Sequence, residues 1–283
     1  MDSSRFDRVF PAQFSGDLKV SWPDGKRIAV MLAFDLDAET MWTTRGDGNA
    51  DHITNLSRGA YGPVQGVPRI LNMLDSFGLK ATFFVPGVVA DKYPDVVKEI
   101  AARGHEIGFH GYFHEEFSTT TCEQENATME RCEQLIRKLT GQQMVSHRAP
   151  GGVIHDYSLR LFVERGYIAS SNWRNSDGPF IHELDGVKIP LVEVPKDSIF
   201  DDTAYDFYTD SAPERYELKS PGEMLEIWKE EFDTLADEQD DQFCAPSPVY
   251  RPCKPRQYAQ GSDWIHAVPR RWIDTTGPWP NGF

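Results

Sequence analysis

Short apolar runs of strand length alternate with helical patterns along most of this chain, and this alternation restricts its fold more than any other feature. Strands are predicted at residues 27–33, 81–85, 106–109, just before Arg148, and at 167–172 and 191–194. Helices are predicted at residues 64–77, 95–103, 121–139, 157–164 and 223–235, and a long polar loop at residues 40–56. Alternating strands and helices without internal repeats are typical of parallel β/α organisation. Periodicity does not distinguish an open sheet from a closed barrel.

Two histidines, His110 and His114, follow the predicted strand at residues 106–109. If the chain turns into a helical loop at Gly111, this spacing places both imidazoles on one face. Neutral imidazole is a common ligand of zinc-like ions, and two such ligands leave room for a carboxylate and water. The alternative is a pair of hydrogen-bonded histidines near a loop, because this spacing alone has many false positives.

Two aspartates, Asp35 and Asp37, follow the first predicted strand directly. They share one face if the strand persists, since side chains alternate along a strand. A buried carboxylate needs a partner, and the end of a buried strand is where barrels carry their chemistry. We favour one aspartate as a metal ligand beside the two histidines and the other as a general base. The alternative is two aspartates that cap a turn.

A third motif, Arg148-Ala149-Pro150-Gly151, follows another apolar stretch. Together with Asp35-x-Asp37 and His110-x-x-x-His114, in this order, it resembles the polysaccharide deacetylase (NodB-homology, carbohydrate esterase 4) superfamily. The resemblance covers residues 27–238. It implies an α/β fold, a distorted (β/α)7 barrel of the NodB-homology type, with its site at the carboxyl ends of the strands.

A narrower resemblance rests on the spacing of the two aspartates, because sugar deacetylases usually have adjacent ones. With this spacing and with the segments at residues 57–63 and 66–69, the chain is similar to the branch that holds cyclic imide hydrolases, allantoinases and some peptidoglycan-deacetylase-like proteins. This resemblance implies metal-dependent hydrolysis of a non-peptide C–N bond, in a small cyclic imide. The alternatives are an N-deacetylase of polysaccharide or peptidoglycan, and an inactive metal-binding oligomer.

The resemblance also implies a role for each motif residue. Asp37, His110 and His114 would hold a divalent metal ion, and two imidazoles with one carboxylate favour zinc. Asp35 would take a proton from the attacking water, while Arg148 would pair with this carboxylate and keep it ionised.

Four further residues complete the predicted site. The backbone N–H of Gly151 would stabilise the tetrahedral oxyanion. Tyr61, Trp173 and Asp202 are predicted to contact the substrate. Trp173 fits a core position after its strand equally well.

Charge and composition exclude several classes of partner. The 29 basic and 44 acidic residues give a formal net charge of −15, which argues against binding nucleic acid or an anionic membrane. Residues 1–19 lack the apolar core of a signal peptide, and no apolar run approaches the ~18 residues of a membrane span. Four cysteines without framework spacing predict free thiols. We expect a cytoplasmic enzyme with a small-molecule substrate that forms a homo-oligomer, either a dimer or a tetramer.

The chain divides into an N-terminal arm at residues 1–26, the barrel at 27–242, and an atypical Pro-rich tail at 243–283. The superfamily ordinarily carries a His-Pro element on a late strand, and no residues of the tail fit it. If the possible codons of residues 244–253 are read in a frame that begins one nucleotide later, they can encode Val-Leu-His-Pro-Gln-Phe-Ile-Gly-Arg. This sequence contains the expected His-Pro element. We therefore expect a frameshift, with no strand after Gln242, loss of the last strand and helix, and a poorly packed tail.

Overall fold

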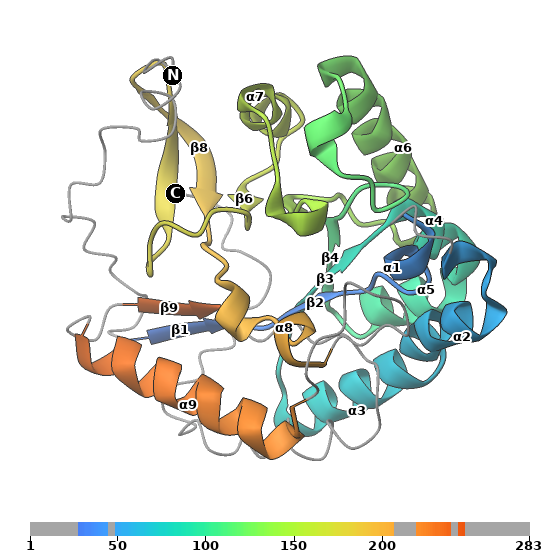
Figure 1. Cartoon of the computed structure of the whole chain (residues 1–283). Coiled ribbons are helices and arrows are strands. Elements are labelled where there is room, and N and C mark those ends of the chain that lie inside the picture. Colours follow the sequence, from blue (N-terminus) through green and yellow to red (C-terminus); the bar gives the residue numbers. More distant parts are fainter. Residues whose placement is uncertain (1–27, 45–48, 207–218, 239–242, 247–283) are drawn as a thin grey trace.

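The computed structural model describes residues 28–44, 49–206, 219–238 and 243–246, in which strands lie at the centre with helices around them (Figure 1). The predicted arm at residues 1–26 and the tail from residue 247 onward lie outside the described residues. None of the helices in the described part of the chain is long and apolar enough to cross a membrane.

Strands and helices alternate along the chain broadly as predicted. The strands are β1 (Ile28–Met31), β2 (Ala33–Asp35), β3 (Thr82–Val85), β4 (Glu106–Phe109), β5 (Ser146–His147), β6 (Ala169–Ser170), β7 (Phe180–Leu184), β8 (Val187–Glu193) and β9 (Phe243–Pro246). The helices are α1 (Thr40–Thr43), α2 (Ile53–Tyr61), α3 (Val67–Phe77), α4 (Gly87–Lys92), α5 (Pro94–Ala102), α6 (Cys122–Thr140), α7 (Asp156–Glu164), α8 (Thr203–Asp206) and α9 (Pro221–Glu238).

The main sheet has the order β2-β3-β4-β5-β6-β8-β7, and its neighbours are parallel except for the β7–β8 hairpin. Leu32 separates β1 from β2, so the first strand serves two sheets: β1 pairs with β9, and β2 pairs with β3. Within the described residues the sheets do not close between β7 and β9. This arrangement is an α/β fold consistent with the predicted distorted barrel.

The prediction of no strand after Gln242 is wrong for residues 243–246. These residues form β9, which runs parallel to β1 with Phe243 opposite Ile28 and Pro246 opposite Met31. Within the described residues, Pro246 ends β9 at the edge of a two-stranded sheet, a position where proline is tolerated. A strand is therefore present at residues 243–246, while the frameshift, the boundary at residue 242 and the loss of the last helix remain predictions.

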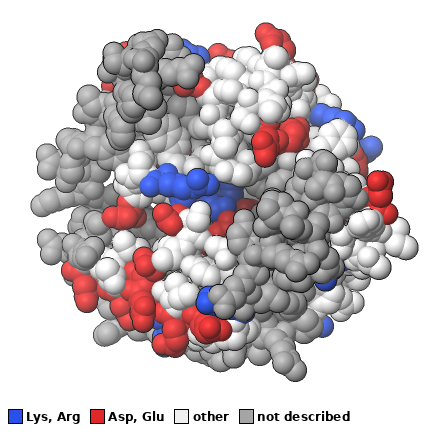
Figure 2. All heavy atoms as spheres, viewed as in Figure 1, with Lys and Arg blue, Asp and Glu red and all other residues white. Residues whose placement is uncertain are grey.

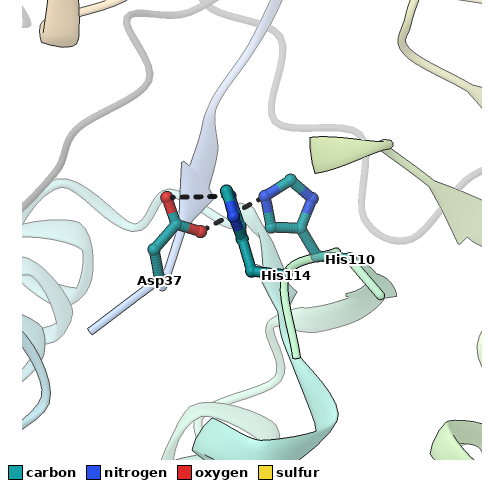
Figure 3. Close-up of side chains that lie close together, drawn as sticks. All are labelled: Asp37, His110 and His114. Carbon is teal, nitrogen blue, oxygen red and sulfur yellow. Dashed lines mark ion pairs between the residues drawn. The ribbon is translucent and has the colours of Figure 1, made fainter. Parts of the chain in front are cut away.

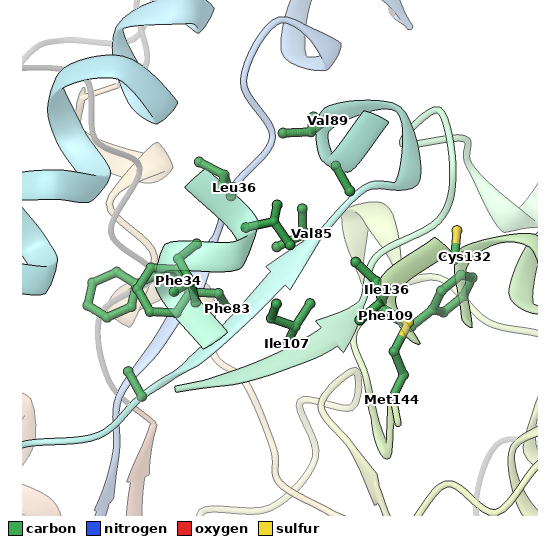
Figure 4. Close-up of a cluster of buried hydrophobic side chains, with 14 of the residues drawn as sticks. Phe34, Leu36, Phe83, Val85, Val89, Ile107, Phe109, Cys132, Ile136 and Met144 are labelled. Carbon is green, nitrogen blue, oxygen red and sulfur yellow. The ribbon is translucent and has the colours of Figure 1, made fainter. Parts of the chain in front are cut away.

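The core fills the space between the central strands and the surrounding helices (Figure 4). Phe34 on β2 stacks against Phe83 on β3, with ring centroids 5.0 Å apart. Val85, Ile107 and Phe109 are fully buried on β3 and β4. Burial of each such side chain stabilises the fold by about 1.5–3 kcal/mol. This core holds β2, β3 and β4 together, so their carboxyl ends meet at one edge.

Helix α6 confirms the helix predicted at residues 121–139. Thr121 and Gln124 form a reciprocal capping box at its start, and Gly141 ends it with a φ of 78°. Cys122 and Cys132 on this helix are free thiols, as predicted.

The prediction of a long polar loop at residues 40–56 is wrong, because the described residues in this range are mostly helical. Both the backbone N–H and the hydroxyl of Thr40 donate to the carbonyl of Asp37, at 3.0 and 2.6 Å. These bonds start a helical turn directly after Asp37, so α1 begins there. A 3-10 helix and α2 follow.

Acidic side chains dominate part of the surface, as the net charge predicts. On the face in Figure 2 they gather at the lower left, over α9, while Lys and Arg side chains gather near the centre. A neutral or compact substrate fits such a surface better than a polyanion does.

Candidate active site and metal centre

Asp37, His110 and His114 converge at the carboxyl ends of β2 and β4 (Figure 3). One possible ligand atom from each lies within 4.8 Å of the other two. His110 Nε2 is 3.2 Å from Asp37 Oδ1, and His114 Nε2 is 3.6 Å from Asp37 Oδ2. Asp37 and His110 are buried, and His114 is 14% exposed, so the cluster can be reached from one side.

The two histidines lie on a tight turn. The prediction of a helical loop at Gly111 is therefore wrong. Gly111 and His114 have φ values of 71° and 62°, in the left-handed region that a helix does not use. The Glu115 carboxylate accepts hydrogen bonds from the backbone N–H groups of Tyr112 and Phe113, at 3.0 and 2.7 Å. The turn, and not a helix face, brings the two imidazoles together.

His110 is oriented in the way that a metal ligand requires. Its Nδ1 lies 2.6 Å from the backbone carbonyl oxygen of Arg148. A carbonyl can only accept, so Nδ1 carries the hydrogen and Nε2 turns its lone pair towards Asp37. Metal-binding histidines are commonly fixed by such a bond on the other ring nitrogen. Two imidazoles and a carboxylate therefore fit a divalent metal ion.

Asp35 and Arg148 form the predicted buried ion pair beside this cluster. Arg148 Nη1 donates to Asp35 Oδ1 at 2.8 Å, and both side chains are 2% exposed. Burial raises the pKa of the Asp35 carboxyl, but Arg148 and then Lys196 outweigh this effect and hold the pKa below its ordinary value. Asp35 is therefore ionised at neutral pH, the state in which a carboxylate can accept a proton.

The other predicted site residues lie at varying positions. Gly151 is exposed in the loop after β5, with a φ of 67° and open space where a Cβ would point. Trp173 is half-buried after β6 and packs edge-on against Phe180 and His182. Both flank the carboxyl ends of the strands.

Tyr61 and Asp202 lie on or beside helices α2 and α8. The hydroxyl of Tyr61, at the end of α2, accepts a hydrogen bond from Arg69 on α3. Asp202 is buried just before α8, and its backbone carbonyl accepts from the N–H of Tyr205. Their contact with substrate remains a prediction.

Two comparisons with known proteins agree with this geometry. The polysaccharide deacetylase family profile matches residues 60–169. A solved structure of a candidate polysaccharide deacetylase from Mycobacterium smegmatis is 30% identical, with a TM-score of 0.84 over 92% of this chain and 90% of that one. The chain belongs to the polysaccharide deacetylase family.

Other relatives of this family member differ in their named activities. The peptidoglycan deacetylase of Helicobacter pylori is 27% identical over 237 residues, which are 76% of this chain and 80% of that protein. The structure of Puue allantoinase is 20% identical, with a TM-score of 0.75 over 90% of this chain and 89% of that one, which shows a shared fold. Family membership supports a hydrolase of amide C–N bonds.

Lys196 is a residue of this deacetylase-family site that no sequence motif indicated. Its Nζ lies 3.8 Å from Asp35 Oδ2 and 2.9 Å from Asp201 Oδ2. The available signal was its position shortly after the strand predicted at residues 191–194, since site residues follow strand ends.

Two consecutive residues after β6, Ser171 and Asn172, hold the Arg148 loop, and the motifs did not indicate this either. Ser171 Oγ accepts from Arg148 Nη2 at 3.0 Å, and Asn172 Oδ1 accepts from the N–H of Ala149 at 2.7 Å. The buried carboxylate of Glu193 on β8 accepts from the backbone N–H groups of Asn172 and Trp173. Strand β8 thereby fixes the loop that presents Arg148 to Asp35.

Proposed function

We propose that this chain is a metal-dependent N-deacetylase, which removes acetyl groups from N-acetylated sugars of a polysaccharide such as peptidoglycan. The observation that carries the proposal is the meeting of Asp37, His110 and His114 with the Asp35–Arg148 pair at one edge of the sheet. The 237-residue similarity to the Helicobacter pylori peptidoglycan deacetylase supports this substrate class.

The residues that would hold the metal are Asp37, His110 and His114, and we propose zinc from the donor set. When bound, such an ion makes a water molecule more acidic and polarises the substrate carbonyl. Protein groups supply the remaining steps.

Asp35 would act as the general base. Arg148 already occupies its Oδ1, so Oδ2 is the oxygen available to accept the proton of the attacking water. Arg148 orients this carboxylate through a buried, charge-assisted hydrogen bond. The exposed Gly151 N–H lies in the same loop as Arg148 and would stabilise the developing oxyanion.

Cyclic imides are the second candidate substrate class. The spacing of Asp35 and Asp37 favours them, whereas the likeness to an allantoinase shows only the fold. The comparisons support the N-deacetylase better. Homo-oligomer formation and a cytoplasmic location remain proposals of the sequence.

The test is a substrate panel with metal-reconstituted protein. The protein is stripped with a chelator and reloaded with Zn²⁺, Co²⁺ or Mn²⁺, then assayed on chitin oligomers, peptidoglycan fragments and cyclic imides. Acetate release from an N-acetylated sugar is expected, with loss of this activity in the Asp35→Asn variant. Turnover of cyclic imides alone would replace the N-deacetylase by an imide hydrolase. Metal binding without turnover of any substrate would favour an inactive metal-binding protein.

A further inference from the structure

Hydrolysis of an amide needs a proton donor for the leaving nitrogen as well as a base for the water. Among the residues that the structure describes, Arg148 and Lys196 are the two Lys or Arg side chains that form ion pairs with Asp35. Arg148 is a poor candidate, because its guanidinium does not release a proton in proteins and already binds Asp35 and Ser171. Of these two cations, only Lys196 can donate a proton.

Several contacts hold Lys196 in place after β8. Its backbone N–H donates to the carbonyl of Trp173 at 2.9 Å, and its Nζ contacts Asp201 Oδ2 at 2.9 Å. Asp201 is itself fixed, since its Oδ1 accepts from the backbone N–H of Thr203 at 3.0 Å. Lys196 is thus a tethered side chain and not a mobile surface lysine.

The ammonium group of Lys196 also has an N–H donor available for a substrate. Lysine carries three N–H donors, and Asp201 engages one of them at 2.9 Å, while Asp35 Oδ2, at 3.8 Å, lies beyond hydrogen-bond distance. The side chain is 14% exposed, so a remaining donor can meet a substrate that enters beside Asp35.

We propose that Lys196 is a catalytic residue that donates the proton to the leaving nitrogen of the substrate amide. This inference rests on the proposed amide hydrolysis. The water oxygen bonds to the carbonyl carbon as Asp35 Oδ2 takes one water proton. The C–N bond then breaks, its electron pair stays on nitrogen, and a proton moves from Lys196 Nζ to that nitrogen. The proton on Asp35 returns to the neutral Lys196 amine, which leaves the carboxylic acid and the free amine as products.

The competing explanation is a purely structural role, called a tether below, in which Lys196 only holds the loop of Asp201 against Asp35. The two explanations differ for substrates whose leaving group needs no proton. A 4-nitrophenolate ion leaves unprotonated, so cleavage of 4-nitrophenyl acetate does not need the donor. A tether would serve the amide and the ester equally.

The test compares wild type, Lys196→Met and Lys196→Arg on a chitin oligomer and on 4-nitrophenyl acetate. We expect Lys196→Met to lose about 10²–10⁴-fold in kcat on the amide and less than about 10-fold on the ester. Lys196→Arg keeps a charge for Asp201 but offers no transferable proton, so it should retain the ester activity without restoring the amide activity. Lys98→Met, which removes an exposed pair with Asp95 on α5, is the control.

Equal losses on both substrates, or amide activity restored by Lys196→Arg, would overturn the donor role. Metal content and thermal melting of each variant separate a folding defect from a catalytic one. If the wild type does not deacetylate the oligomer, the proposed N-deacetylase fails, and the same comparison on a cyclic imide and the matching cyclic anhydride tests Lys196. Inactivity on every substrate would overturn both proposals.

Discussion

At the residue scale, the chemistry of the site depends on which atom of each side chain is already engaged. The Arg148 carbonyl accepts a hydrogen bond from Nδ1 of His110, so Nε2 is available to a metal ion. The Arg148 guanidinium donates to Oδ1 of Asp35, so Oδ2 is available to accept a proton. Arg148 therefore orients both the ligand and the base, through its backbone and its side chain respectively.

Removal of either histidine should prevent metal binding. His110→Ala or His114→Ala leaves two ligands, which seldom hold zinc. We expect less than a tenth of the wild-type metal content, measured by elemental analysis after dialysis. His52→Ala, at an exposed position on α2's N-terminal side, should keep its metal. Full occupancy in either site variant would remove that histidine from the ligand set.

The two aspartates should fail in different ways. Asp35→Asn should keep the metal and lose about 10²-fold or more in kcat, the scale of a general base. Asp37→Asn should lose metal affinity first, because it removes a ligand charge. Metal titration and kcat of both variants decide this, with thermal melting to check folding, since Asp35→Asn disturbs a buried ion pair. The opposite pattern would mean that base and ligand are exchanged.

At the element scale, α2 supports the turn that carries Asp37. Ala38, the next residue, has a φ of 49°, which L-residues seldom adopt. Gly59 on α2 packs directly behind it: a Cβ at Gly59 would lie 2.6 Å from the Ala38 carbonyl and from Glu39 Cα. Only a glycine allows the helix and the turn to approach this closely.

Gly59→Ala should therefore weaken both folding and metal binding. The new methyl group must displace backbone, at a cost of about 1–3 kcal/mol in the free energy of unfolding. Urea unfolding and metal titration measure the two effects. Gly178→Ala is the matched control, because no heavy atom lies within 4 Å of a Cβ there. Wild-type metal affinity in Gly59→Ala would show that α2 does not position Asp37.

A buried histidine that joins β3 and β4 gives a pH-dependent prediction. His105 Nδ1 accepts the backbone N–H of Ala81 at 3.2 Å, and burial, with Lys80 nearby, lowers the pKa of His105 to about 4. The unfolded chain binds this proton more tightly, so the stability is complete above pH 6.5 and is lost as the pH falls towards 4. With allowance for solvent screening, we expect about 1 kcal/mol between pH 7 and 5.

Urea unfolding of wild type and His105→Gln at pH 7 and pH 5 checks this expectation. The variant should lose about 1 kcal/mol less than wild type over this range, because its side chain does not titrate. The other histidines are the same in both proteins, so their contributions cancel in the comparison. Equal losses would mean that His105 is not held neutral.

The sequence predicted the elements whose signals are local. The capping box at Thr121 marked α6, and the apolar runs before Asp35 and His110 marked β2 and β4. The turn at Gly111 and the β7–β8 hairpin were missed, because they depend on packing with distant residues. Lys196 was missed for the same reason: β8 and β2 bring it to Asp35 from 161 positions away in the chain.

At the scale of the whole molecule, the first strand links two sheets. Strand β9 pairs with β1 and ends at Pro246, opposite Met31. The shifted reading frame would place a histidine at position 246, at the level of Met31 on β1. Sequencing of the source gene tests the frameshift directly, and an intact frame through residues 244–253 would show it to be wrong.

In the function proposed above, a metal ion held by Asp37, His110 and His114 works with Asp35 to cleave an N-acetyl amide. The most direct measurement is acetate release from a chitin oligomer while Zn²⁺ is titrated into the stripped protein. We expect negligible acetate release without metal and a rate that rises until about one ion is bound per chain. The Asp35→Asn variant should bind the metal without releasing acetate. Release that continues unchanged after the metal is stripped would contradict the proposed function.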